Sequence, residues 1–248
     1  MPIFVFHIGT LTIAPSWYGL MYAMSFSLFF LILRRQKMSE KNIDILLLYT
    51  IIGVIVWGRI GYVLFYNFSY YFENLSEILM PWKWGMSFHG WALGVILAWY
   101  LAARRMKISF LGLSDQLVWI VPIGLFLGRI GNYINGELLG WAWYAWFLAK
   151  TVQWISYFPT PLLEASLEGI LLLGILHWKK KHIQYPGQLG VWFLGGYWIA
   201  RFVAEFFRDP DVQIGYLLGS WMTLGHIFSL LMICSSIFLH FLLRKKED

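Results

Sequence analysis

The chain has 248 residues and a formal net charge of +6; it is 59% hydrophobic and only 13% charged. Soluble globular chains carry about 25% charged residues, so this composition excludes that class. Apolar runs of about 20 residues recur along the chain, which predicts an all-α polytopic membrane protein. A β-barrel would instead show alternating segments of about ten residues. The single cysteine, Cys234, excludes an intrachain disulfide.

Seven apolar segments are the predicted membrane spans. In chain order they cover residues 17–34, 44–66, 86–104, 114–135, 162–178, 188–207 and 222–243. The longer connections lie near 67–85 and 136–161, on the predicted outer face. No soluble domain interrupts the series, so we expect one transmembrane helical-bundle domain over residues 1–248. No basic segment precedes the first span, and we therefore expect no cleavable signal peptide.

Basic residues alternate between the two sides of the predicted spans. Thirteen of the 19 lysines and arginines follow the odd-numbered spans: Arg34, Arg35, Lys37, Lys41, Arg104, Arg105, Lys107, Lys179, Lys180, Lys181, Arg244, Lys245 and Lys246. The opposite connections hold only Lys83, Lys150 and Arg208. Because cytoplasmic loops are enriched in basic residues, the N-terminus is predicted outside and the C-terminus in the cytoplasm. Basic residues dispersed along inner loop ends do not indicate a nucleic-acid partner.

Charged residues inside the spans are costly and usually pair with one another or line a functional cavity. With the predicted orientation, the polar residues of several spans fall at one depth, near the outer leaflet: Tyr18, Arg59, His89, Arg129, Glu137, Glu164, Glu168, Arg201 and Glu205. Structural ion pairs are the alternative for any one pair. Convergence from independent spans favours a functional site, and arginine suits bidentate binding of a phospholipid phosphate.

Glycines surround two of these arginines. The tetrapeptide Gly-Arg-Ile-Gly occurs at 58–61 and again at 128–131, where Gly136 follows. Such glycines predict a loosened helix end beside a wet cavity. Close helix packing through small residues is the alternative.

One longer motif carries a family resemblance. GRIGNYINGELLG at 128–140 resembles the signature of the prolipoprotein diacylglyceryl transferases. Four further segments are similar to this family in the same order: WYGLMY at 17–22, GRIGYVLFYN at 58–67, MSFHG at 86–90 and RFVAEFFRDPD at 201–211. The resemblance covers essentially the whole chain. It implies the family's seven spans with an outer N-terminus.

The resemblance also implies a reaction in the bacterial cytoplasmic (inner) membrane, without a cofactor or metal. A diacylglyceryl group passes from phosphatidylglycerol to the lipobox cysteine thiol of a preprolipoprotein, and glycerol phosphate is released. The residues implied to bind phosphatidylglycerol are Tyr18, Arg129, Asn132, Glu137, Gly140 and Arg201. The implied supporting residues are Arg59, Glu164, Glu205 and Arg208.

Catalytic roles follow from chemistry at these positions. The acceptor thiol has an ordinary pKa of about 8.5, so a base helps to form the thiolate. His89 suits that role by residue type and depth. Arg129 and Arg201 suit the stabilisation of negative charge on the departing glycerol phosphate.

The chain departs from the family pattern at three places. Trp91 stands where the family has a second glycine after the histidine, residues 158–163 keep little of the usual segment, and His226 replaces a glutamine. These departures favour, as an alternative, a divergent relative that uses another acceptor or headgroup. A phospholipid-binding or translocating membrane protein without chemistry is the other alternative.

Overall fold

The structure is a computed structural model that describes residues 2–8, 11–65, 68–79, 87–142, 149–152, 155–209, 216–217 and 221–245. The chain divides into two compact units. One unit combines Met1–Ser27 with Ser114–Asp248, and the other is Leu28–Leu113. Helix α1 (Trp17–Arg35) contributes to both.

In the unit Leu28–Leu113, two long helices pack through glycines. These are α2 (Glu40–Phe65) and α4 (Phe88–Met106), with α3 (Phe68–Glu73) and the 3₁₀ turn η1 (Leu75–Leu79) between them. A Cβ at Gly90 would lie 2.1 Å from the carbonyl oxygen of Trp57, and one at Gly94 would lie 2.2 Å from that of Gly53. Only glycine allows this backbone approach. The approach uses Gly90, whereas Trp91 stands beside it and is partly exposed.

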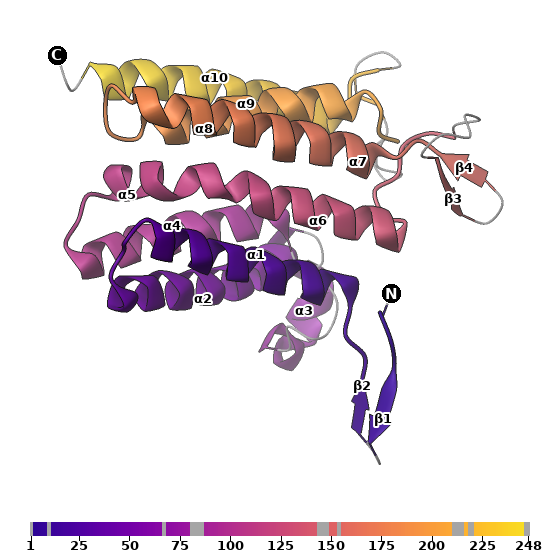
Figure 1. Cartoon of the computed structure of the whole chain (residues 1–248). Coiled ribbons are helices and arrows are strands. Elements are labelled where there is room, and N and C mark those ends of the chain that lie inside the picture. Colours follow the sequence, from indigo (N-terminus) through magenta and orange to yellow (C-terminus); the bar gives the residue numbers. More distant parts are fainter. Residues whose placement is uncertain are drawn as a thin grey trace. The chain divides into compact units, whose positions relative to one another are not determined.

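Three long helical stretches form most of the other unit. The first joins α5 (Phe110–Leu117), η2 (Val118–Ile120) and α6 (Val121–Asn135). The second joins α7 (Thr160–Glu164), the π-helical η3 (Ala165–Leu171), α8 (Leu172–Lys179) and η4 (Lys180–His182). Then α9 (Gln188–Glu205) and α10 (Leu224–Arg244) pack against each other (Figure 1).

Two short antiparallel hairpins accompany the helices. Strand β1 (Phe6–Ile8) pairs with β2 (Leu11–Ile13), and β3 (Lys150–Val152) pairs with β4 (Ile155–Tyr157). The prediction of a purely α-helical chain therefore missed both hairpins. They lie outside the apolar runs, where backbone groups need partners other than a helix ladder.

A helix or a joined helical stretch covers most of each predicted span, and the helical class is confirmed. Within the described residues, five stretches are long and apolar enough to cross a membrane: Trp17–Arg35, Glu40–Leu64, Phe110–Asn135, Thr160–His182 and Leu224–Arg244. These helices are those expected of a polytopic membrane protein. Helices α4 and α9 are not in that set, and both carry glycine and charged residues. The count of seven spans and the orientation stay predictions.

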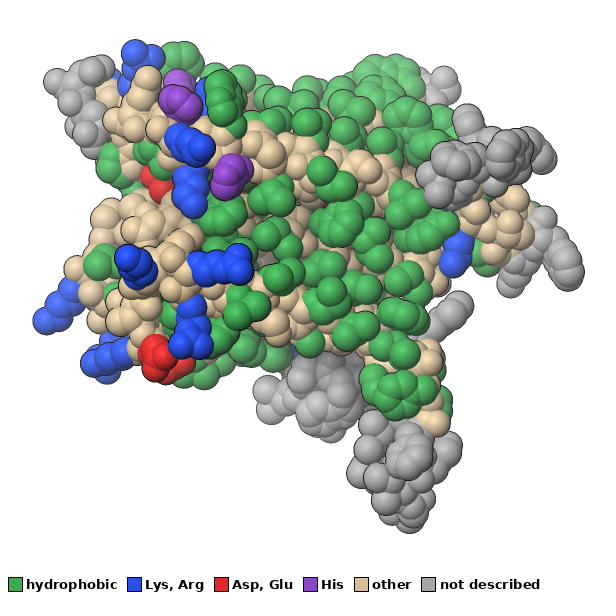
Figure 2. All heavy atoms as spheres, in the orientation of Figure 1, with side chains coloured by type: hydrophobic (Ala, Val, Ile, Leu, Met, Phe, Trp, Pro, Cys, Tyr) green, Lys and Arg blue, Asp and Glu red, His purple; other side chains and the backbone are tan. Residues whose placement is uncertain are grey.

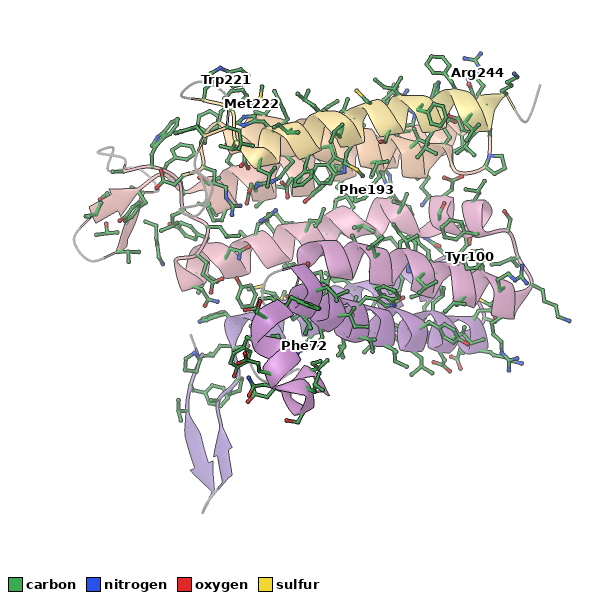
Figure 3. All side chains as sticks on the ribbon, turned by 180° about the vertical axis from the view of Figure 1, so that it is seen from behind. Phe72, Tyr100, Phe193, Trp221, Met222 and Arg244 are labelled. Atoms are coloured by element: carbon green, nitrogen blue, oxygen red, sulfur yellow. The ribbon has the colours of Figure 1, made fainter. Side chains whose placement is uncertain are left out.

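The helix surfaces are as apolar as a lipid environment requires. Hydrophobic side chains cover the sides of the helices in Figure 2, and many stand out from the ribbons in Figure 3. Trp221 and Arg244 lie at opposite ends of α10 (Figure 3), as interfacial residues do at the two ends of a membrane helix.

The glycine-rich end of α6 is not loosened. Helix α6 runs without interruption to Asn135 and ends at Gly136, whose φ of 72° is the left-handed conformation of a helix C-cap. The expectation of a loosened helix end at 128–136 was therefore wrong. A Cβ at Gly128 would meet nothing within 4 Å, so this glycine is not required by packing.

Candidate active site

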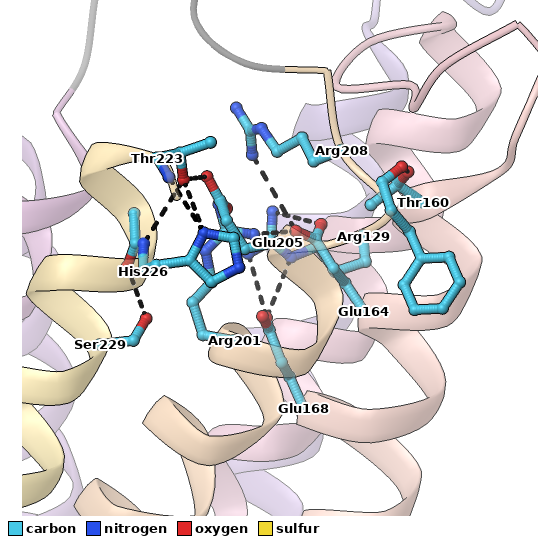
Figure 4. Close-up of polar contacts among 12 residues, drawn as sticks. Arg129, Thr160, Glu164, Glu168, Arg201, Glu205, Arg208, Thr223, His226 and Ser229 are labelled. Atoms are coloured by element: carbon cyan, nitrogen blue, oxygen red, sulfur yellow. Dashed lines mark hydrogen bonds and ion pairs between the residues drawn. The ribbon is translucent and has the colours of Figure 1, made fainter. Parts of the chain in front are cut away.

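Three arginines and three glutamates form one buried cluster in the unit that contains α6 to α10 (Figure 4). We call it the arginine–carboxylate cluster; its members are Arg129, Glu164, Glu168, Arg201, Glu205 and Arg208. Three helical segments supply them: α6, the α7–η3 stretch, and α9 with the turn after it. Formally, the three positive and three negative charges balance.

Glu164 is the centre of the cluster. Its side chain is 0% exposed, and its Oε2 lies 2.9 Å from Nη1 of Arg129. Its Oε1 accepts a hydrogen bond from Nη1 of Arg201 and lies 3.9 Å from Nη1 of Arg208. A buried carboxylate needs such partners, because an unpaired buried charge costs on the order of several kcal/mol. One carboxylate thus holds arginines from two other segments.

Arg129 has a second carboxylate partner, Glu168. Oε2 of Glu168 accepts from Nε of Arg129 at 3.1 Å and from Nη2 at 3.0 Å. Gly169 allows the two helices to come this close, since a Cβ there would lie 2.7 Å from Cβ of Phe126 on α6. The π-helical turn of η3 carries Glu168, and such turns are frequent at functional sites.

Arg201 is held from the other side by Glu205, four residues along α9. Nη2 of Arg201 donates to Oε2 of Glu205 at 2.6 Å. Oε1 of Glu205 accepts from Oγ1 of Thr223 at 2.8 Å. A Cβ at Gly225 would lie 2.3 Å from Oε1 of Glu205, so that position must be glycine for the carboxylate to fit.

Thr223 and His226 form a capping box at the start of α10. The backbone N–H of Thr223 donates to Nδ1 of His226 at 3.2 Å, and the Thr223 hydroxyl accepts from the backbone N–H of His226. Since Nδ1 accepts, the ring proton lies on Nε2. The ring is fully buried against Phe202, Phe206 and Trp221, and Nε2 has no partner among the described residues.

Arg208 has the loosest carboxylate contact of the three arginines. Its backbone forms an isolated bridge with Gly140, where a Cβ would lie 2.0 Å from the carbonyl oxygen of Phe207. Burial, reinforced by the neighbouring charge of Arg201, lowers the pKa of the Arg208 guanidinium. The structure therefore gives Gly140 a steric role next to Arg208.

A second polar group joins three of the predicted headgroup residues. The hydroxyl of Tyr18 donates to Oε2 of Glu137 at 2.5 Å and accepts from Nδ2 of Asn132 at 2.5 Å. The Tyr18 ring packs against Gly131, where an added Cβ would lie 3.1 Å from Cδ1 of Tyr18. Asn132 follows Arg129 by three residues and shares its helix face. Predictions for Tyr18, Asn132 and Glu137 thus converge in one hydrogen-bonded group.

The other two predicted residues lie in the unit Leu28–Leu113. Arg59 is buried, donates to the carbonyl oxygens of Glu77 at 2.6 Å and Ile78 at 3.2 Å, and lies 4.8 Å from the centre of the Tyr71 ring. His89 is in the first turn of α4, and its side chain lies outside the described part of the chain. Among the described residues, no group of three or more His, Cys, Asp or Glu is placed to hold a metal ion.

Comparison with known proteins decides the family. A sequence model described as "Prolipoprotein diacylglyceryl transferase" matches residues 3–242. The chain belongs to the prolipoprotein diacylglyceryl transferase family. The resemblance inferred from the motifs is confirmed over nearly the whole chain.

Relatives named phosphatidylglycerol–prolipoprotein diacylglyceryl transferase support this membership. The relative from Idiomarina loihiensis is 42% identical over 243 residues, covering 90% of this chain and 88% of its own. That from Methylococcus capsulatus is 40% identical, with 90% and 88% covered. That from Rickettsia felis is 42% identical, with 92% of both chains covered. The similarity to this transferase family thus extends over most of the chain.

Sequence reasoning placed Glu168 only as a polar residue at the start of a span, and it did not single out Thr223. Glu168 follows Glu164 by four residues, so the shared helix face was a signal that both contact the same partner. Thr223 stands three residues before His226, which is the spacing of a capping box. Its hydrogen bond to Glu205 had no sequence signal.

Proposed function

We propose that this chain transfers a diacylglyceryl group from phosphatidylglycerol to the lipobox cysteine of a bacterial preprolipoprotein. Its family membership over residues 3–242 supports the reaction. The observation that carries the assignment to a site is the arginine–carboxylate cluster, in which buried Glu164 holds Arg129 and Arg201 together. Pre-positioned guanidinium groups suit a phosphate-bearing substrate.

The reaction displaces a phosphate ester. The thiolate sulfur forms a bond with the terminal carbon of the diacylglyceryl group, and the bond from that carbon to the phosphate oxygen breaks. Glycerol phosphate leaves with the electron pair, and the thiol proton passes to a base. The nucleophile belongs to the substrate, so the enzyme needs a cation for the leaving group and a proton acceptor.

The arginines provide the cation. Nε and Nη2 of Arg129 donate to Glu168, and Nη1 lies 2.9 Å from Oε2 of Glu164. These contacts hold the guanidinium plane, and among the described residues they leave N–H groups of Nη1 and Nη2 for a ligand. Among the described residues, Arg208 has one carboxylate contact, at 3.9 Å, and thus the most donors available of the three arginines. We therefore assign Arg208 a direct phosphate contact beside Arg129 and Arg201. Charge developing on the leaving oxygen then meets donors that are already oriented.

His89 is the proposed proton acceptor. Histidine is the residue type most often used as a general base near neutral pH. Tyr18, Asn132 and Glu137 are proposed to orient the glycerol headgroup, since their hydrogen-bonded group combines donors with a carboxylate acceptor. Gly140 allows the backbone of Phe207, next to Arg208, to pack closely against it. Arg59 links α2 to η1 through its hydrogen bonds to two backbone carbonyl oxygens.

We further propose seven spans, an outer N-terminus and a cytoplasmic C-terminus. Basic residues end α1, α4, η4 and α10. In the stretch from α7 to η4, Glu164 and Lys180 are separated by roughly 24 Å, at about 1.5 Å per residue. If basic ends are cytoplasmic, the cluster is near the outer leaflet, where a lipobox peptide arrives after export.

Two of the departures from the family pattern, at residues 158–163 and at His226, do not favour a different reaction. Glu164 lies at the centre of the cluster although residues 158–163 differ from the usual segment. At His226, the imidazole fills the capping-box role for which glutamine is also suited. Neither of these two departures supports the divergent relative over the transferase.

The experiment is a direct transfer assay. Purified protein is incubated with phosphatidylglycerol vesicles and a lipobox peptide, and mass spectrometry follows the peptide. We expect the peptide to gain a diacylglyceryl group with the unsubstituted chain. We expect no product with Arg129→Ala or His89→Gln.

Control outcomes separate the alternatives. If a folded, lipid-binding protein never consumes phosphatidylglycerol, the transferase is wrong. If His89→Gln retains full turnover, His89 is not the base. Transfer with another headgroup only would indicate the divergent relative.

A further inference from the structure

A groove lies on the surface beside α6 and α8, on a different face from the arginine–carboxylate cluster. Its volume is about 450 Å³, and its apolar walls are Trp119, Ile123, Ile170, Leu173 and Trp178. A Cβ built at Gly174, in its floor, would meet nothing within 4 Å. Ile170 is 61% exposed, whereas Glu168 two residues earlier is fully buried in the cluster.

One end of this groove is strongly basic. His177 and Lys181 line it, and Lys179, Lys180 and His182 adjoin them. Blue and purple side chains gather at this end of α8 in Figure 2. Within the described part of the chain, none of the three lysines forms an ion pair with a carboxylate. The positive charge is therefore available to an anionic ligand.

Tryptophans hold the lysines beside the groove. Nζ of Lys180 lies 3.9 Å from the centre of the Trp119 ring, and Nζ of Lys179 lies 4.1 Å from that of Trp192. Such cation–π contacts keep an ammonium group at an aromatic surface. Tryptophan and lysine together are typical of the level where lipid headgroups meet hydrocarbon.

We propose that this groove binds one anionic phospholipid of the surrounding bilayer. The phosphate lies at the His177–Lys181 end, and an acyl chain lies along the apolar walls over Gly174. From Ile170 to Lys181 the helix rises roughly 16 Å, at about 1.5 Å per residue. That length matches one leaflet of hydrocarbon, about 15 Å. Basic pockets between membrane helices recognise anionic headgroups by this charge complementarity.

The groove is separate from the candidate active site, and the proposal does not depend on the transfer reaction. A neutral lipid would fill the apolar walls but leave the lysines without an anion. Phosphatidylglycerol is therefore used as the probe, and phosphatidylcholine is the neutral competitor.

The test is photolabelling of the full chain in detergent with phosphatidylglycerol that carries a diazirine in an acyl chain. Peptide mapping by mass spectrometry locates the label. We expect labelled residues within 119–123 and 170–178. Unlabelled phosphatidylglycerol should compete at least about tenfold better than phosphatidylcholine, because several lysines face the headgroup.

Two variants test the two halves of the groove. Gly174→Phe fills the apolar floor, and Lys180→Glu with Lys181→Glu reverses charge at the basic end. We expect each to reduce labelling of the groove by about tenfold or more, since two reversed charges remove at least that much attraction. The control Arg35→Glu reverses an exposed charge elsewhere and should leave labelling unchanged.

Arg129→Ala distinguishes this groove from the candidate active site. Groove labelling should persist in that variant even when transfer is lost. Equal competition by phosphatidylcholine, or unchanged labelling in Gly174→Phe, would overturn the proposal. Loss of groove labelling in Arg129→Ala would place the bound lipid in the arginine–carboxylate cluster instead, and would also overturn it.

Discussion

The tetrapeptide Gly-Arg-Ile-Gly occurs in α2 and in α6, and its arginine has different partners in each. Arg59 donates to the backbone carbonyl oxygens of Glu77 and Ile78 and lies over Tyr71. Arg129 is held by the carboxylates of Glu164 and Glu168. Identical local sequence thus gives one arginine that fastens a connecting segment and one that belongs to a charge-balanced cluster. The partners, supplied by distant segments, determine the role.

Removal of the shared carboxylate should have the largest effect. Glu164→Gln leaves buried Arg129 and Arg201 short of one anion, which should destabilise the protein by about 3–5 kcal/mol. The unfolding temperature in detergent should fall on the order of 10 °C. Intrinsic fluorescence during heating measures it.

Glu40→Gln is the matched control. Glu40 pairs with Arg34 at 3.5 Å on the surface, where an ion pair contributes about 0–1 kcal/mol. Its unfolding temperature should hardly change. An equal change of unfolding temperature in Glu164→Gln and Glu40→Gln would mean that the cluster contributes no more to stability than solvent-screened surface charges do.

Arginine-to-lysine changes at both tetrapeptides test the comparison directly. Arg129 uses Nε, Nη1 and Nη2 at once, which a point charge cannot reproduce. We expect Arg129→Lys to lower kcat/KM in the transfer assay about a hundredfold or more, as removal of an oriented donor does. Arg59→Lys retains a donor for carbonyl oxygens and should lose less than about tenfold.

The contrast between these variants is the informative quantity. Near-normal turnover in Arg129→Lys would contradict phosphate binding by an oriented guanidinium. A similar loss of kcat/KM in Arg59→Lys would mean that Arg59 also serves the reaction. The arginines of the two tetrapeptides would then not have different roles.

The same contrast explains what could be predicted from sequence. Apolar run length places helices because each run must satisfy its backbone polar groups within itself, and the five long apolar helical stretches of the described chain lie on predicted runs. The inward-facing charges mark the site because their burial is costly. Sequence cannot give the pairing, since Arg129 and Glu168 meet through the close approach of Gly169 to Phe126. Nor does it distinguish a loosened α6 end from the regular helix that Gly136 caps.

The smallest effect is expected at the edge of the cluster, at His226. Glutamine there can accept the hydrogen bond from the Thr223 backbone as a capping box requires, so His226→Gln should keep both stability and turnover. His226→Leu has similar apolar bulk but loses the acceptor, and should destabilise the protein by about 1 kcal/mol.

A structural cap and a positioning role differ in their kinetic signature. Thr223 also donates to Glu205, which holds Arg201, so a displaced cap should reach the guanidinium. If His226 positions Arg201 through this route, His226→Leu lowers kcat a few-fold, of order 1 kcal/mol in the barrier, with little change in KM for phosphatidylglycerol. If only the unfolding temperature falls and kcat is unchanged, the cap at His226 does not position Arg201. The different roles of Arg59 and Arg129 then depend only on the carboxylates that contact Arg129.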